Sequence, residues 1–354
     1  MMKKKLLMVV VALMATMSMV AQKVVVVDAN GRGIPLVSVL TEDGNLIGTT
    51  DLNGVIADVK GAAKVAITHV AYKPQVVTMA SLTGGRVTME DLDYDLQEIV
   101  VVPKPYIYVE TFYRVYVYRN DSLCYFLSGI MPNAYDPERK KREHGSYYHA
   151  CGEFSSKMGA AITWGARAQE HHAGLVPING VPEKTMKEKY YTTISEETPN
   201  HKTYSNPQGV VGQFDRTNGQ THVTLDGSKM QMYANEVKGE TKVLNKRKEM
   251  GYEYQYTLIF DNDEGHDLDV TTFMMESNHW EYTDKKSHVK YIIETYATDH
   301  YYMDKQEWKD KKKDIKENYS SMMTLKQLEE YERQHNIPAL SSATRQAIDK
   351  LKAY

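Results

Sequence analysis

The sequence predicts a mainly β protein of two domains that ends in a short helical tail. Three observations predict this class: short apolar runs separated by Gly- and Asn-containing turns, 26 tyrosines against 6 phenylalanines, and helix-type apolar spacing that begins only near the C-terminus. Tyrosine favours half-buried strand faces, where the ring packs and the hydroxyl stays hydrated. We therefore expect a seven-stranded β-sandwich, then a larger antiparallel β-rich domain, then helices.

Residues 1–21 have the three parts of a secretory signal peptide. Three lysines precede an apolar run from Leu6 to Val20, and Ala21 offers a small residue for cleavage. Cleavage after Ser18 stays open as an alternative, because Met19 is large for the position three residues before Gln22. No later run is long and apolar enough to predict a transmembrane anchor. We expect an exported protein of the periplasm, the outer-membrane surface or the extracellular space.

Residues 23–102 contain the turn and strand signals of the β-sandwich. Asn53-Gly54 is a strong reversal signal, because both residues tolerate positive φ. Alternating apolar side chains in the runs can fill a core, so these residues specify a fold and carry no reactive group. The runs that predict the seven strands are 24–27, 36–40, 46–50, 55–59, 65–70, 75–79 and 86–89.

The same segment resembles the carboxypeptidase regulatory-like family through about eighty residues in the family's order. The resemblance implies a prealbumin-like (transthyretin-like) sandwich that is non-catalytic and often stands at the N-terminus of envelope proteins of Gram-negative bacteria. Ala71 departs from the glycine that the family usually has before its tyrosine. The matching stretches are Val27-Asp28-x-x-Gly31, Ile34-Pro35-Leu36-Val37-x-Val39, Gly48 to Gly54, Val65-x-Ile67-x-x-Val70-Ala71-Tyr72-Lys73 and Leu96 to Val102.

After a Pro-Lys-Pro linker at 103–105, residues 106–304 predict the β-rich domain. Tyr106 to Arg119 alternates strictly and has one more polar face, which predicts a sheet covered on a single side. Asp136 to Asn206 is rich in His, Pro, Gly and Lys. We expect long loops there, with a short helix begun by Asp136-Pro137, and any binding site of this domain. Later strands are expected at 221–225, followed by an Asp226-Gly227 turn, and at 252–260 and 289–298.

Residues 305–354 predict the helical tail. Thr324 and Gln327 have the spacing of a capping box, and Pro338 ends the helix that they begin. A second helix is expected from Ser341 or Ser342 to Leu351, so the chain would finish in a helical pair packed on the sheet or on a partner.

The two cysteines, Cys124 and Cys151, leave two alternatives open. An exported protein meets an oxidising compartment, where a disulfide between them can persist. The other alternative is a pair of buried free thiols, because the sequence does not place their Cα atoms within bridging distance.

No segment has the pattern of a catalytic, cofactor-binding or metal-binding motif. His144, His149 and Cys151 lie close together and His171-His172 follows, but the spacing matches no established zinc site. The turn Asp261 to Gly265 has its glycine at the fifth position and not at the sixth, so it does not fit a calcium loop. We therefore name no catalytic residue, no metal ligand and no cofactor.

The charge balance argues against nucleic acid as a partner. Without the signal peptide the chain has 40 basic and 46 acidic side chains, a net charge of about −6. Export, an accessory module and the lack of a catalytic motif predict a non-catalytic cell-envelope binding or scaffolding protein whose sandwich docks on an envelope protein or glycan. The alternative is a hydrolase of unrecognised class with a site in the 136–206 loops.

Overall fold

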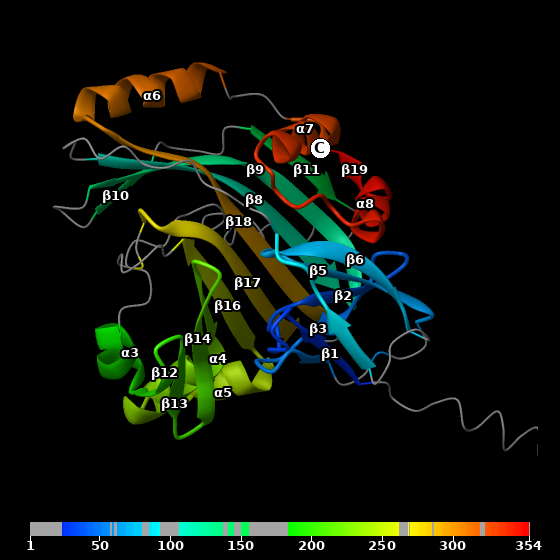
Figure 1. Cartoon of the computed structure of the whole chain (residues 1–354), viewed down its shortest axis with the longest axis vertical. Helices are drawn as coiled ribbons and strands as arrows, with labels where there is room; N and C mark the ends of the chain where they lie inside the picture. Colours follow the sequence, from blue (N-terminus) through cyan, green and yellow to red (C-terminus); the bar gives the residue numbers. More distant parts are fainter. Residues whose placement is uncertain are drawn as a thin grey trace, which may run out of the picture.

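Figure 1 shows the computed structural model of the chain, which is mainly β. The structure describes residues 23–56, 59, 62–79, 85–92, 106–136, 141–144, 150–155, 183–261, 268, 270–284, 287–318 and 323–353. The predicted signal peptide, the linker at 103–105 and the family stretch Leu96 to Val102 lie outside the described residues. No described helix has both the length and the apolar character needed to cross a membrane.

Described residues between 23 and 92 form the N-terminal module, in which every one of the seven predicted runs overlaps a strand. Val26, Val39, Val65 and Val87 come from both of its sheets and share one hydrophobic cluster, as their alternation predicted. The three-stranded sheet has the order β4 (Val55–Ile56), β1 (Val24–Val27), β7 (Arg86–Thr88), and the four-stranded sheet has the order β3 (Leu46–Thr49), β2 (Ser38–Thr41), β5 (Lys64–His69), β6 (Tyr72–Thr78).

The reversal at Gly54 requires glycine. Its φ is +73°, and a Cβ there would stand 2.7 Å from the Cα of Gly33. Asp51 prepares this turn, because its carboxylate accepts the backbone N–H groups of Asn53 and Val55 at 2.9 and 2.8 Å. Local turn chemistry therefore fixes how β3 leads into β4.

Twelve described strands between residues 106 and 353 form one antiparallel sheet, here called the large sheet. Its order is β12-β13-β14-β15-β16-β17-β18-β8-β9-β11-β19, and β10 pairs with β9. The strands are β8 (Tyr106–Arg119), β9 (Ser122–Asp136), β10 (Lys141–His144), β11 (Ala150–Ser155), β12 (Thr193–Thr198), β13 (His201–Asn206), β14 (Gly209–Thr217), β15 (Gln220–Asp226), β16 (Glu253–Asp261), β17 (Phe273–Asp284), β18 (Ser287–Met303) and β19 (Lys352–Ala353).

Strand β8 occupies the predicted residues, but the prediction that its sheet is covered on one side is wrong. Both faces of β8 are buried along nearly its whole length. Phe112 and Tyr116 join the cluster that the module and the tail helices complete, whereas Tyr113 and Val117 join a separate cluster on the other face. Tyrosine rings lie on both faces of β8 and pack against other parts of the protein. The face that the sequence marks as more polar is therefore buried as well.

Three helices were not predicted: α3 (Glu183–Tyr190), α4 (Gly227–Val237) and α5 (Thr241–Glu249). The expected Asp226-Gly227 turn is the start of α4, where the Asp226 carboxylate caps the helix by accepting the Lys229 N–H at 2.9 Å. The expectation of long loops from Asp136 to Asn206 is also wrong for the described part, which contains β10–β13 and α3. Asp136 ends β9, and the predicted helix after it lies outside the described residues.

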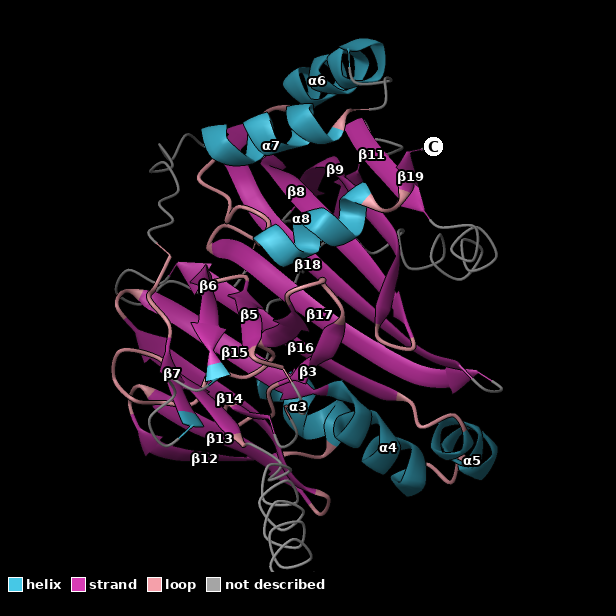
Figure 2. Ribbon diagram, turned by 90° about the vertical axis from the view of Figure 1, so that its right-hand side faces the viewer, coloured by secondary structure: helices cyan, strands magenta, loops and turns pink. Residues whose placement is uncertain are grey.

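The C-terminal helices agree with the prediction. A full capping box between Thr324 and Gln327 begins α7 (Leu325–Gln334), and Ser341 caps α8 (Ser342–Asp349). Before them, α6 (Lys305–Asn318) carries charges of both signs and buries Trp308. Figure 2 shows α7 and α8 lying across the large sheet beside the module.

The N-terminal module packs on the large sheet along a surface here called the seam. The backbone N–H of Leu46 in β3 donates to the carbonyl of Asp121 at 2.9 Å, and Gly44 lies against Ala343 of α8. One hydrophobic cluster runs without a break from the module through β8, β9 and β16–β18 to α7 and α8. The module is therefore a fixed part of the fold in this structure.

Candidate functional site

The seam contains a cavity of about 380 Å³, here called the seam cleft. Its size falls in the range of about 300–1,000 Å³ that is typical of ligand pockets. The module forms one wall with β3 and the turn before β4. The beginning of β16, the later part of β17 and the beginning of β18 form the other wall. The lining residues on which the argument depends are Thr49, Asp51, Glu253, His279, Glu281 and Lys290.

Three charged residues form a row across the sheet wall of the seam cleft. Glu253 of β16 stands directly opposite Glu281 of β17, which stands directly opposite Lys290 of β18. The Lys290 ammonium lies 3.2 Å from Glu281 Oε2 and donates to Thr49 Oγ1 of the module at 3.0 Å. Like charges directly opposite one another destabilise a sheet, so the Glu253–Glu281 pair is a local conflict that points to a functional site.

The two carboxyl groups stand side by side on neighbouring strands and interact electrostatically. Partial burial and the neighbouring Glu281 carboxylate raise the pKa of Glu253. Glu253 therefore retains its proton to a higher pH than an isolated glutamate does. An ammonium group could replace that proton, because it offers several N–H donors to the same four oxygens.

His279 lies beside this row and is neutral. Its Nε2 lies 3.0 Å from Ser277 Oγ, and only 5% of the residue is exposed. Burial and the nearby Lys290 ammonium lower the pKa of His279 well below its usual value. With His279 uncharged, Asp51, Asp121 and the two glutamates outnumber Lys290, and the seam cleft is acidic.

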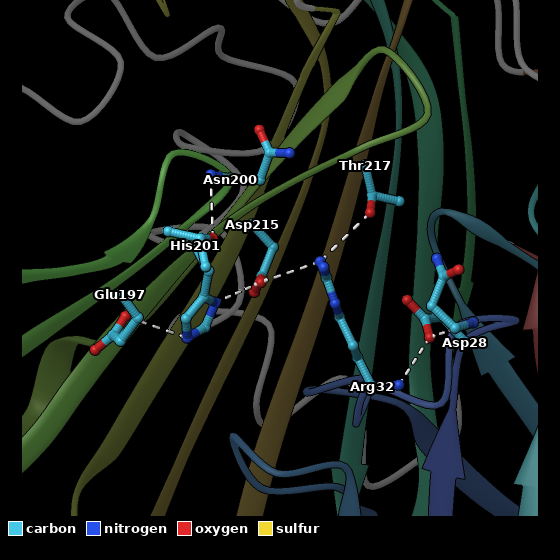
Figure 3. A network of polar contacts seen from close by, with 9 residues as sticks. Asp28, Arg32, Glu197, Asn200, His201, Asp215 and Thr217 are labelled. Carbon is cyan, nitrogen blue, oxygen red and sulfur yellow. Dashed lines mark hydrogen bonds and ion pairs between the residues drawn. The ribbon is translucent and has the colours of Figure 1, made fainter.

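A second polar cluster lies at another place along the seam and is shown in Figure 3. His201 of β13 points between two carboxylates, with Nδ1 2.6 Å from Asp215 Oδ1 and Nε2 3.5 Å from Glu197 Oε2. Arg32 of the module reaches Asp215 at 3.6 Å and Thr217 Oγ1 at 3.4 Å.

The geometry of this second cluster suits a structural contact that holds the module against the large sheet. Asp215 is paired with both His201 and Arg32, and the Thr217 hydroxyl accepts from Arg32 and has no contact with the imidazole in the figure. A base–nucleophile pair of the kind used in covalent catalysis is not formed among these residues. The adjoining cavity has about 40 Å³, which suits one or two water molecules.

Of the residues that the sequence analysis grouped as His144, His149, Cys151, His171 and His172, the structure describes the backbone of two. His144 pairs across β9 with Asn133, and Cys151 stands opposite Gly129. His149, His171 and His172 lie outside the described residues. Among the described side chains no three His, Cys, Asp or Glu groups converge as metal ligands.

Cys124 is buried with a free thiol, which donates to the carbonyl oxygen of Val117 at 3.3 Å. On β9 it lies five residues from Gly129, the residue that faces Cys151. The side chain of Cys151 is outside what the structure describes, so both alternatives for the two cysteines stay predictions.

No protein-family model, no curated protein and no solved structure matches the chain. The residues of the seam cleft were not identified from the sequence. Glu253, Glu281 and Lys290 form no short motif, and only the strand register places them in one row.

Proposed function

We propose that this is an exported cell-envelope binding protein whose seam cleft takes an amine-bearing group of an envelope protein or glycan. In this proposal the N-terminal module is a prealbumin-like sandwich that scaffolds one wall of the cleft. The leader pattern of residues 1–21 and the resemblance of residues 23–102 support the location. The observation that carries the binding function is the Glu253–Glu281 pair, held across two strands under the module.

The acidity of the cleft favours a cationic ligand over an anionic or neutral one. Charge-assisted hydrogen bonds to a carboxylate are stronger than neutral ones, at about 1.5–3 kcal/mol each. A bound ammonium group would also remove the like-charge conflict between Glu253 and Glu281. Lys290 is already engaged by Glu281 and Thr49, which leaves Glu253, a residue that is only partly buried, as the accessible acceptor.

The same pair does not suit glycoside hydrolysis. Retaining and inverting glycosidases hold their two carboxyl groups about 5 Å or more apart, because a sugar or a water must fit between them. Glu253 and Glu281 are direct cross-strand partners, and the side chains of such a pair lie next to each other with no room for a sugar between them. The hydrolase alternative for residues 136–206 gains no support from the described His201 cluster, where we find no activated nucleophile.

The test is calorimetric titration of the full chain with two matched probes at low salt. A glucosamine tetramer carries amines, and its N-acetylated counterpart has the same rings without the charge. The proposal predicts that the charged probe binds at least about tenfold more tightly. It also predicts that Glu253→Gln removes this preference, while Glu249→Gln, at the exposed end of α5, leaves it unchanged. Equal affinity for the two probes, or full binding by Glu253→Gln, would contradict it.

A further inference from the structure

Three histidines meet at the seam from both of its sides. His69 ends β5 of the module, and His222 of β15 and His279 of β17 belong to the large sheet. His69 and His222 line the same small cavity, and His69 lies near enough to His279 for their charges to interact. His69 and His279 are each only 5% exposed. Three imidazoles therefore stand where the two parts of the molecule touch.

The rings are buried without full hydrogen bonding. His69 Nδ1 accepts the N–H of Ala71 at 3.2 Å, and its Nε2 has no partner among the described residues. His279 Nε2 contacts Ser277, and its Nδ1 is likewise without a partner in the described part of the chain. A second proton on either ring would add a buried charge with no described acceptor waiting for it.

The charged and titratable groups around the three rings give little compensation. His69 faces His222, His279 and the Tyr72 ring, and its other neighbouring cavity is lined by Arg114 and Glu294. His279 faces the Lys290 ammonium as well as His69. The carboxylates of Glu253, Glu281 and Asp51 line the same cleft, but burial and Lys290 still lower the pKa of His279.

His222 is the exception among the three, because carboxylates face it. Asp215 of β14, Asp91 after β7 and Asp28 after β1 raise its pKa in part, and Tyr72 lies with its ring centroid 6.5 Å away. Burial still outweighs these carboxylates and lowers the pKa of His222.

The direction of the pH effect follows from the neutral rings. Burial, and to a smaller extent the charge of His222, lowers the pKa of His69 from 6.5 to about 3. Burial and the Lys290 ammonium lower the pKa of His279. Above pH 6.5 both rings are neutral whether the seam is closed or open, and the closed state carries no penalty. As the pH falls below 6.5, only the open state takes up protons. The ratio of closed to open molecules then falls by about tenfold per pH unit for each such histidine.

We propose that the seam is an acid-sensitive joint, in which protonation of His69 and His279 parts the N-terminal module from the large sheet while each part stays folded. The inference rests on the seam itself and does not depend on which ligand the cleft takes. Acidification opens the seam cleft at its module wall.

Amide hydrogen exchange of the full chain at about pH 7.5 and about pH 5 tests the joint, with rates corrected for the intrinsic effect of pH. The joint predicts that β3, β17 and the first half of β18 lose protection at the lower pH, while β1 inside the module keeps it. Equal protection at both pH values, or loss of protection throughout the molecule, overturns the proposal.

The double variant His69→Gln/His279→Gln supplies the second test, because glutamine is polar and does not titrate. The change in the ratio of closed to open molecules between the two pH values is expected to be at least about tenfold smaller in this variant than in the wild type. His335→Gln, at the C-cap of α7 and outside the group of three histidines, serves as the matched control and keeps the wild-type response. If the double variant does not fold, the exchange of the wild-type chain at the two pH values decides. A folded double variant with the full wild-type response rejects the joint.

Discussion

Arg114 of β8 and Glu332 of α7 form a buried ion pair, with Nη2 2.8 Å from Oε1 and both side chains no more than 5% exposed. The same guanidinium donates to the carbonyl of Pro338 at 2.7 Å and lies 3.5 Å from Glu294. One arginine therefore holds α7 and the chain that follows it against the large sheet. The tail helices pack on the module in turn, so this pair helps to fix both walls of the seam.

Arg114→Met is expected to destabilise the protein by about 3–5 kcal/mol, because Glu332 then stays buried without its partner. The double variant Arg114→Met/Glu332→Leu removes both charges and should regain most of that loss. Urea unfolding of the single and double variants measures the difference. Equal losses in the two would mean that the charge left behind is not the cause.

Gly44→Ala is expected to cost more than Gly31→Ala, although both glycines have φ of +79°. The positive φ costs alanine about 1–2 kcal/mol at either position. A Cβ at Gly31 meets only the flexible end of Arg86 at 3.7 Å, whereas one at Gly44 collides with the backbone of Ala343 in α8. We expect about 1–3 kcal/mol more for Gly44→Ala, measured by urea unfolding. Equal losses of unfolding free energy in the two variants would show that α8 does not pack closely against the module at Gly44.

The module and the tail were predictable because their signals are local. Asn53-Gly54 and Thr324 with Gln327 specify a reversal and a helix start within a few residues, whatever lies around them. Asp226-Gly227 was misread for the opposite reason: the same pair suits a turn or a helix N-cap, and the packing of α4 on β16 decides between them. The burial of both faces of β8 also depends on distant elements.

The candidate site could not be predicted, because it exists only in the strand register. Glu281 and Lys290 are neighbours through the β17–β18 hairpin, but Glu253 joins them only when β16 pairs in the observed register. A shift by one residue would send Glu253 to the other face. His69 and His279 are still further apart in the sequence, and they come near each other only when the module packs on the large sheet.

The central claim is that the module and the large sheet together form one ligand site. Amide hydrogen exchange of the full chain with and without saturating glucosamine tetramer at neutral pH tests it most directly. The account predicts slower exchange on both walls of the seam cleft, in β3 of the module and in β17 and β18 of the sheet. Protection of one wall alone, or protection only at surfaces away from the cleft, would contradict it.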